Sequence, residues 1–482
     1  MIGLLKLQET ISINSHKAVI VANTADAETL FNEKIMFERF EKLAKAGEKL
    51  ISIQNGAYNL YIIISSDKKE ANQSLEYYRT NGCDLLNLLN KDKIEEIEIT
   101  SNVIADAELL AFAEGILLAN YSFDKYKKEK SKHSFKTLKV VSTSIQKSEL
   151  KALKNVVESV FIVRNLVNEP VVFLTAEQFS KEMEKLGKDA GFEVDVLGKS
   201  KIKSLKMGGL LAINAGSPNH PTFNILTYKP KHHTNKQPLV LVGKGVVYDT
   251  GGLSLKETAN SMDIMKCDMA GGAAVLGAIY AIAKNNLPYY VVGLIPATEN
   301  RPDGNAITPG DVITMHDGST VEILNTDAEG RVILGDALSY AKQYNPALVI
   351  DVATLTGSAI MTLGKYGSVM HSTASEEIKA VVKSSGDKVY ERLVELPLWD
   401  EYAKEIESDI ADIKNIGGGT AGATTAAKFL QHFTDYPWIH LDIAGPAYIK
   451  GVDSYRGKNA TGMGVRLLYQ FVNECLLSEH DL

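Results

Sequence analysis

The feature that most constrains the fold is a series of short, nearly continuous apolar segments in the second part of the chain, at 238–242, 289–295, 347–353 and 438–443. Segments with helical apolar spacing lie between them, such as 271–284. Unbroken apolar runs of this length are typical of parallel strands that are buried on both faces. The alternation predicts an α/β domain with a mixed, mostly parallel sheet that helices cover on both faces.

The chain has 482 residues, more than a single core usually supports, so we expect two domains. Residues 1–150 mix short strands such as 61–64 with helical segments such as 105–120, which predicts a smaller N-terminal α/β domain. A segment with helical spacing and no glycine or proline then predicts a linking helix within 151–172. The larger domain is expected to span 173–482.

Composition excludes several classes of protein. The chain is 45% hydrophobic and 23% charged with a net charge of -7, which argues against disorder and against a nucleic-acid partner. The basic run 125–133 is interrupted by Glu129 and is interpreted as a solvated surface segment. We find no signal peptide pattern and no apolar run long enough to span a membrane. Three scattered cysteines argue against a disulfide framework, so we expect a cytoplasmic protein.

Charged residues collect where the strands of the predicted sheet end. Lys244 and Asp249 follow the strand at 239–242, among glycines that let the backbone turn tightly, and Lys256 comes next. Ligands of open α/β sheets bind beyond the carboxyl ends of the strands. A phosphate-binding loop is disfavoured here, because the spacing GxxxxGK[ST] is absent.

Three more carboxylates follow the same rule. Asp268 stands just before a helix that opens with glycines, and Asp327 and Glu329 lie two positions apart in NTDAEGR. If the backbone of NTDAEGR is extended, Asp327 and Glu329 project to the same side. A lone carboxylate in such a place is more often a helix cap or a salt-bridge partner than a ligand.

Four carboxylates on neighbouring loops would repel one another unless cations compensate them. Lysine and arginine could do so as salt bridges, but divalent metals do it better where carboxylate oxygens converge. Two metals also supply a hydrolytic nucleophile at neutral pH. The residues alone leave both alternatives open, with a dinuclear hydrolase as the hypothesis.

The motifs around these residues resemble those of the leucyl aminopeptidase (cytosol aminopeptidase) family of dinuclear metallopeptidases. NTDAEGR at 325–331 is the signature of that family, and further blocks match in the family's order. These blocks are VGKGVVYDTGGLSLK at 242–256, MDIMKCDMAGGAA at 262–274, DVATLTGSA at 351–359 and LDIAGPA at 441–447. The resemblance covers about 163–472, whereas the N-terminal part matches only in size and α/β character.

The resemblance implies a metal site with two divalent ions, Mn²⁺ or Zn²⁺. One ion would be held by Lys244, Asp249, Asp268 and Glu329. The other would be held by Asp249, Asp327 and Glu329, with Asp249 and Glu329 bridging the pair and a bridging water as nucleophile. Lys244 can be a ligand only as a neutral amine.

The family also implies two catalytic residues and a substrate pocket. Lys256 would polarise the scissile carbonyl, and Arg331 would hold a bicarbonate ion that serves as general base. The side-chain pocket would be formed by Met265, Asn325, Ala328, Thr354, Gly357, Ala444 and Ala447. The main chain of Leu355 and Gly357 would bind the substrate backbone. Ala447 departs from the larger methionine that is familiar in the family, so an apolar preference is expected more firmly than a preference for leucine.

The implied function is release of N-terminal amino acids, apolar and leucine-like ones preferred, from peptides with a free N-terminus. Family members form homohexamers, so an assembly role is compatible with catalysis. A rival interpretation is a binding module that keeps the fold without the chemistry. The presence of the five ligands, Lys256 and Arg331 argues against it. We expect Cys267, His371 and His440 to be packed or hydrogen-bonded rather than catalytic, and His232 and His233 to lie at the surface.

Overall fold

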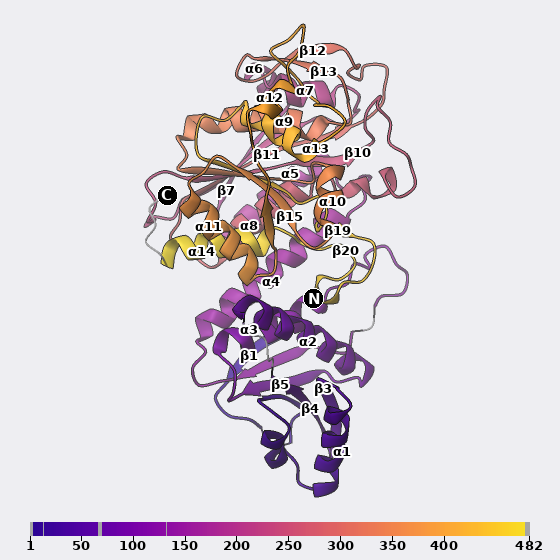
Figure 1. Cartoon of the computed structure of the whole chain (residues 1–482), viewed down its shortest axis with the longest axis vertical. Helices are drawn as coiled ribbons and strands as arrows, with labels where there is room; N and C mark the ends of the chain where they lie inside the picture. Colours follow the sequence, from indigo (N-terminus) through magenta and orange to yellow (C-terminus); the bar gives the residue numbers. More distant parts are fainter. Residues whose placement is uncertain (1–2, 13, 66–69, 132, 478–482) are drawn as a thin grey trace. The chain divides into compact units, whose positions relative to one another are not determined.

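The computed structural model describes residues 3–12, 14–65, 70–131 and 133–477 (Figure 1). Its backbone divides into two compact units. Unit 1 contains Met1–Phe161 together with the short segments Lys388–Tyr390 and Gly451–Gly457, and unit 2 contains the rest. The division falls inside a long helix, α4 (Lys147–Asn168), which occupies the position of the predicted linking helix.

Unit 1 is an α/β layer structure. Its strands are β1 (Leu4–Gln8), β2 (Lys17–Val21), β3 (Leu50–Asn55), β4 (Tyr58–Ile64), β5 (Glu96–Ser101) and β6 (Thr137–Val141). They form one sheet in the order β1-β6-β5-β2-β4-β3, in which every pair is parallel except β3 with β4. Its helices include η1 (Ala25–Leu30), α1 (Lys34–Lys45), α2 (Ala71–Lys91), α3 (Asp106–Ala119) and η4 (Ser454–Arg456). The predicted α/β character of this part is confirmed.

Helices α2 and α3 of unit 1 lie unusually close to each other. A Cβ atom on Gly115 would stand 2.0 Å from the carbonyl oxygen of Arg79, and one on Gly82 would stand 2.4 Å from that of Phe112. Real Cβ atoms do not come this close to backbone oxygens. The two glycines are therefore required by the helix pair.

Unit 2 is built on a nine-stranded sheet. Its strands are β7 (Glu193–Leu197), β8 (Thr222–Tyr228), β9 (Leu239–Gly243), β10 (Gly245–Asp249), β11 (Val291–Asn300), β14 (Leu348–Ala353), β15 (Ser368–Ser372), β16 (Leu393–Glu395) and β18 (Trp438–Asp442). The order is β16-β15-β18-β14-β9-β11-β8-β7, with β10 paired to β11. The central pairs are parallel, whereas β7, β8 and β15 each pair antiparallel with a neighbour. The predicted mixed, mostly parallel sheet is confirmed.

Helices cover both faces of this sheet. They are α5 (Ala176–Ala190), α6 (Lys199–Ser204), α7 (Gly208–Asn214), η2 (Met262–Cys267), α8 (Ala270–Lys284), α9 (Glu329–Ala341), η3 (Lys342–Tyr344), α10 (Gly357–Leu363), α11 (Glu376–Lys388), α12 (Glu401–Lys404), α13 (Gly422–Gln431) and α14 (Val465–Leu477). Helix α8 contacts β9, β11 and β14 and packs with α5 and α14, while α9 contacts β9 and β11 and packs with α7 and α13. Figure 1 shows α8 and α14 on one side of the sheet and α9 and α13 on the other.

The loop predicted after the strand at 239–242, which is β9, is wrong. Lys244 is followed at once by β10, which pairs in parallel with the second half of β11. Val246 is fully buried in this pairing. Gly245 permits it, because a Cβ atom there would stand 2.5 Å from the carbonyl oxygen of Pro296. Lys244 therefore lies at a break between two strands, and Asp249 ends the second one.

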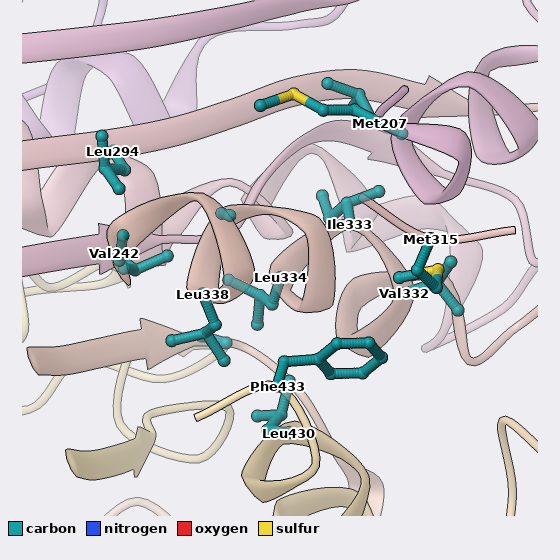
Figure 2. Packing of buried hydrophobic residues seen from close by; sticks show 14 of the residues in the cluster. Met207, Val242, Leu294, Met315, Val332, Ile333, Leu334, Leu338, Leu430 and Phe433 are labelled. Carbon is teal, nitrogen blue, oxygen red and sulfur yellow. The ribbon is translucent and has the colours of Figure 1, made fainter. Parts of the chain in front are cut away.

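The main core of unit 2 surrounds α9, as Figure 2 shows. Leu334 and Leu338 of α9 point toward Phe433, while Val242 and Leu294 approach from the sheet. All of these side chains are fully buried. Burial of α9 on more than one side fixes its axis, and with it the position of its first residue, Glu329.

Two minor sheets complete unit 2. One has the order β12-β13-β17 and contains β12 (Asp311–Thr314), β13 (Thr320–Ile323) and β17 (Ile413–Lys414). The other pairs β19 (Tyr448–Ile449) with β20 (Asn459–Ala460). The strand β13 leads directly into the NTDAEGR segment, so the first small sheet places that segment.

The span Met262–Lys284, which contains η2 and α8, is long and apolar enough to cross a membrane by length and composition. The expectation that no run reaches this length was therefore wrong for this span. However, 83% of its 18-residue window is buried inside the protein. Because the sheet and α14 cover α8, this apolar character is that of a core helix.

Replacing Gly271 by alanine should destabilise unit 2 by about 1–3 kcal/mol, the usual cost of overpacking a dense interior. The reason is that a Cβ atom there would lie 2.0 Å from the carbonyl oxygen of Val352 in β14. Urea unfolding followed by circular dichroism measures the change. Gly304→Ala is the control, because its Cβ atom would meet nothing within 4 Å. Equal midpoints for the two variants would contradict this account.

Candidate active site

Three buried carboxylates converge at the carboxyl ends of the central strands of unit 2. Asp249 is the last residue of β10, Asp268 follows η2, and Glu329 is the first residue of α9. They are 1%, 4% and 2% exposed, respectively. One oxygen of each lies within 4.8 Å of the other two. The protein thus holds several acidic groups together where water cannot screen them.

The assumption of an extended backbone between Asp327 and Glu329 is wrong. The chain turns after β13, with the amide of Ala328 donating to the carbonyl of Asn325 at 3.2 Å, and α9 begins at Glu329. The charge of Glu329 in the first turn is favoured by the helix dipole. Asp327 still joins the cluster, because both Asp327 and Asp249 pair with Lys256. The turn, rather than an extended segment, therefore brings Asp327 and Glu329 to the same site.

Lys244 lies at the centre of the buried cluster. Its Nζ is 2.8 Å from Oδ1 of Asp268, 2.7 Å from Oε1 of Glu329 and 2.8 Å from the carbonyl oxygen of Thr354. Lys256 forms a second ionic centre, with its Nζ 2.9 Å from Oδ2 of Asp249 and 2.5 Å from Oδ1 of Asp327. Each lysine therefore pairs with two of the four carboxylates, Lys244 with Asp268 and Glu329 and Lys256 with Asp249 and Asp327.

The pKa values in this network follow from burial and mutual charge. Burial and the charge of Glu329 raise the pKa of Asp249 to about 7. Burial raises the pKa of Asp268 well above its ordinary value. Burial alone would lower the pKa of Lys244, but the charges of Asp268 and Glu329 raise it. Lys244 is therefore protonated unless another cation, such as a metal ion, binds the same carboxylates and lowers its pKa.

The donor set fits divalent cations. Oδ2 of Asp268 and Oε2 of Glu329 are buried and have no hydrogen-bond partner within the described residues. An unpaired buried carboxylate oxygen is costly, and a cation among the converging oxygens would remove that cost. Hard and borderline metals such as Mn²⁺ and Zn²⁺ accept carboxylate ligands. The residues that could hold ions are Lys244, Asp249, Asp268, Asp327 and Glu329.

Two polar residues that the sequence interpretation missed tie the loops of the site together. Asn300, at the end of β11, donates to Oδ1 of Asp249 at 2.8 Å and to the carbonyl of Thr326 at 2.9 Å. The hydroxyl of Thr326 donates to the carbonyl of Gly251 at 2.6 Å and accepts from the amide of Ser254 at 2.8 Å. Asn300 follows an apolar strand as the ligands do, and this position is the signal that could have identified it.

A pocket of about 500 Å³ opens onto the carboxylate cluster. Eleven of the predicted site residues line it: Lys244, Asp249, Lys256, Met265, Asp268, Asp327, Glu329, Thr354, Leu355, Gly357 and Ala444. It is also lined by residues that the sequence interpretation did not single out for the site: Asn260, Ser261, Ile264, Cys267, Thr356, Ile360, Gly445, Tyr448 and Lys450. Most of these residues lie within or beside the motif blocks, so their proximity to the blocks could have predicted that they line the site.

Four predicted site residues do not line this pocket. Asn325 and Ala328 belong to the turn before α9, and Ala447 is 2% exposed. Arg331 is 8% exposed and donates from Nη1 to the carbonyl of Asn415 at 3.0 Å. Burial lowers the pKa of Arg331 to about 10, so it remains positively charged at neutral pH. Its Nε has no partner within the described residues, which suits an anionic acceptor such as bicarbonate.

Asp442, the last residue of β18, holds the pocket wall at 354–357 by hydrogen bonds. Asp442 accepts from the amide of Leu355 at 3.1 Å and from the hydroxyl of Thr356 at 2.7 Å. The amide of Leu355 is therefore engaged within the protein. Its carbonyl is the part of the Leu355 main chain that a substrate could use.

The histidines and Cys267 lie as expected. His440 Nδ1 is 2.6 Å from Oδ1 of Asp351, and His371 Nε2 is 3.2 Å from the hydroxyl of Thr424. Both histidines are fully buried. Burial raises the pKa of Cys267 to about 12, which keeps it a thiol at neutral pH. His232 is exposed and His233 is partly exposed.

Comparison with known proteins identifies the family of this chain. Residues 161–469 match the model of the cytosol aminopeptidase family, catalytic domain. A probable cytosol aminopeptidase of Chloroherpeton thalassium is 49% identical over 314 residues, which cover 64% of this chain and 61% of that protein, less than two thirds of its length. A probable cytosol aminopeptidase of Chlorobium limicola is 45% identical over 385 residues, covering 76% of this chain and 75% of that protein.

Solved structures resemble both units. A mutant of tomato leucine aminopeptidase matches with a TM-score of 0.85 and 26% identity, covering 98% of this chain and 96% of that one. The bottromycin maturation enzyme BotP in complex with Mn matches with a TM-score of 0.83 and 28% identity, covering 96% and 99%, respectively. The family match spans the strands, turns and helices that carry the carboxylate cluster. The chain therefore belongs to the cytosol aminopeptidase family, a family of metal-dependent aminopeptidases.

Proposed function

We propose that this protein releases N-terminal amino acids, apolar and leucine-like ones preferred, from peptides by a two-metal hydrolytic reaction. The observation that carries the proposal is the convergence of buried carboxylates that line a pocket, two of which have an oxygen without a hydrogen-bond partner among the described residues. Such a cluster is costly without cations. Its location beyond the carboxyl ends of parallel strands is the usual one for an active site of this fold class.

Divalent cations bound here would supply a hydrolytic nucleophile at neutral pH and polarise the scissile carbonyl. Asp249, Asp268, Asp327, Glu329 and Lys244 are the proposed ligands, with Asp249 and Glu329 shared between the ions. Manganese is named with the related enzyme BotP. We therefore propose Mn²⁺ or Zn²⁺ for this chain.

Lys256 and Arg331 are the proposed catalytic cations. Lys256 is partly exposed to the pocket and pairs with Asp249 and Asp327, so its ammonium stands beside the place where a scissile carbonyl would lie. A fixed cation there stabilises the developing oxyanion. Arg331 carries a positive charge, and its Nε finds no acceptor in the part of the chain that the structure describes, which supports its proposed role of holding bicarbonate as general base.

The pocket supports selection of an apolar N-terminal side chain. Ile264, Met265, Leu355, Ile360 and Ala444 give it apolar walls. Apolar walls favour a substrate side chain that loses water on entry. The proposed substrate contacts also include Asn325, Ala328, Thr354 and Gly357. Ala447, which is buried and does not line the pocket, is proposed to affect the size of the pocket indirectly.

The proposal includes a cytoplasmic location and a homohexamer. Relatives are named as cytosol aminopeptidases, which supports the location. The hexamer rests on the family resemblance. Sedimentation velocity measures it directly, and a monomer at micromolar concentration would contradict it.

The first test compares leucyl-p-nitroanilide with its N-acetylated form. The chelated protein should be inactive, and added Mn²⁺ or Zn²⁺ should restore cleavage of the free-amine substrate alone. The reason is that a blocked amine cannot complete the coordination of a metal. The absorbance of the released nitroaniline gives the rate. Equal cleavage of both substrates would refute an aminopeptidase, and no cleavage with either metal would favour a binding role.

Replacing Glu329 by alanine should abolish activity and reduce the bound metal, because this carboxylate is proposed to contact both ions. Mass spectrometry of metals in the dialysed protein measures the stoichiometry. Glu299→Ala is the matched control, since Glu299 is equally buried, at 1% exposed, and does not line the pocket. Unchanged metal content in Glu329→Ala would exclude the bridging role.

Replacing Lys256 by alanine should keep the metals and lower kcat by about 10²- to 10³-fold, the usual loss when one electrostatic stabiliser is removed. Steady-state kinetics and metal analysis of the same preparation separate the two effects. Lys256→Arg keeps the positive charge and should retain more activity than the alanine variant. A loss of metal equal to the loss of kcat would assign Lys256 to metal binding instead.

A further inference from the structure

We propose that Asn415 is a positioning residue of this active site, because it braces the turn that carries Asp327 and, through its main chain, also holds Arg331. The inference rests on the proposed function for its catalytic meaning. No motif of the family signature contains Asn415, which lies 84 positions after Arg331 in the sequence. It is fully buried.

Asn415 first extends a small sheet. It follows β17 directly, and its amide donates to the carbonyl of Glu322 in β13 at 2.9 Å. This bond continues the parallel pairing of Val321 with Ile413 and of Glu322 with Lys414. The strand β13 ends at Ile323, one residue before the turn begins. The backbone pairing therefore stops where the site begins.

The side chain of Asn415 takes over where the backbone pairing stops. Its Oδ1 accepts from the amides of Leu324 at 2.8 Å and Asn325 at 3.3 Å. Its Nδ2 donates to the carbonyl of Asn325 at 2.7 Å. A primary amide offers the same donor and acceptor as a peptide unit, so it binds both polar groups of Asn325 at once. Among the side chains of similar size, only asparagine supplies both functions in this geometry.

Asn325 transmits this restraint to the proposed ligand. The side chain Oδ1 of Asn325 accepts from the amide of Asp327 at 2.8 Å, and its carbonyl accepts from the amide of Ala328 at 3.2 Å. Asn415 thus fixes Asn325, and Asn325 fixes the backbone of the turn up to the start of α9. A shift of the turn would move Asp327 away from Lys256 and from the other carboxylates.

The carbonyl of Asn415 has a second role. It accepts the bond from Nη1 of Arg331 at 3.0 Å, which leaves Nε of Arg331 without a partner within the described residues. The guanidinium of Arg331 is therefore held by a hydrogen bond at Nη1, while its Nε can donate to a ligand. One buried residue sets the positions of a proposed ligand and of a proposed catalytic cation.

The test compares Asn415→Ala and Asn415→Asp with a matched control, Asn235→Ala. Asn235 is also buried, at 5% exposed, and brackets Tyr290 in the same way, accepting from its amide at 2.7 Å and donating to its carbonyl at 2.9 Å. Tyr290 precedes β11, at the end opposite to Asn300 and the carboxylates. The control thus removes an equivalent brace far from the site.

Both Asn415 variants lose the bond to the carbonyl of Asn325, so both should lower kcat and raise the Kd for Mn²⁺. The expected size of each effect is about 10- to 100-fold, the usual cost of removing a group that orients metal ligands. KM for leucyl-p-nitroanilide should change less than kcat, because the pocket walls at 264–265 and 354–357 lie on other loops and only Asn325 and Ala328 of the proposed contact set belong to this turn. Calorimetric titration of the chelated protein with Mn²⁺ gives the Kd independently of activity.

Asn235→Ala should lower the unfolding midpoint while kcat and the Kd for Mn²⁺ stay at their values in the unmutated protein. If the Asn415 variants lose stability like Asn235→Ala but keep kcat and Mn²⁺ affinity, the positioning role is refuted. Asn415→Asp preserves the shape and the acceptor, so it provides the measurement if Asn415→Ala does not fold. If the unmutated protein cleaves no aminoacyl substrate, the proposed function fails, while the Mn²⁺ comparison still decides whether Asn415 positions the ligands.

Discussion

The structure of unit 2 depends on the compensation of buried negative charge. Asp249, Asp268 and Glu329 bring their carboxylates together at less than 5% exposure, and Asp327 joins them at the edge of the pocket. Repulsion between such groups in a medium of low dielectric is large. Lys244 and Lys256 offset part of it, since each pairs with two of the four carboxylates. Carboxylate oxygens of Asp268 and Glu329 still lack a hydrogen-bond partner within the described residues, so the two lysines do not satisfy the cluster completely.

A stiff frame is needed to keep these groups together against their repulsion. The frame is the parallel centre of the sheet, with α8 pressed against β14 through Gly271 and α9 surrounded by core side chains. Hydrogen bonds from Asn300, Thr326 and Asn415 then join the loops at the strand ends to one another. Packing fixes where the helices start, and the polar braces fix how the intervening turns are shaped. Neither alone would hold four carboxylates from three separate segments in register.

Much of the fold could be predicted from the sequence, because buried parallel strands and core helices have a clear apolar signature. The segments 347–353 and 438–443 correspond closely to β14 and β18. The strand β10 was missed, since it follows β9 after a single residue and a break of that kind leaves no turn signal. The predicted strand ends indicated which charged residues lie at the site, and the family motifs indicated the roles of these residues. The extended form expected around Asp327 was wrong, because the local pattern could not show that α9 begins as early as Glu329.

Asn415 could not have been found in the same way. It acts through bonds to the backbone of a segment that is distant in the chain, and such bonds leave no local pattern. The small sheet that Asn415 follows also has a consequence for the order of events during synthesis. A chain grows from its N-terminus, so all five proposed ligands are made well before residue 415. The nascent protein carries the metal-binding groups while the strand that braces their turn does not yet exist. The geometry of the site is therefore completed late, when β17 has been made and has paired with β13, and the growing chain passes through most of its synthesis without a finished centre.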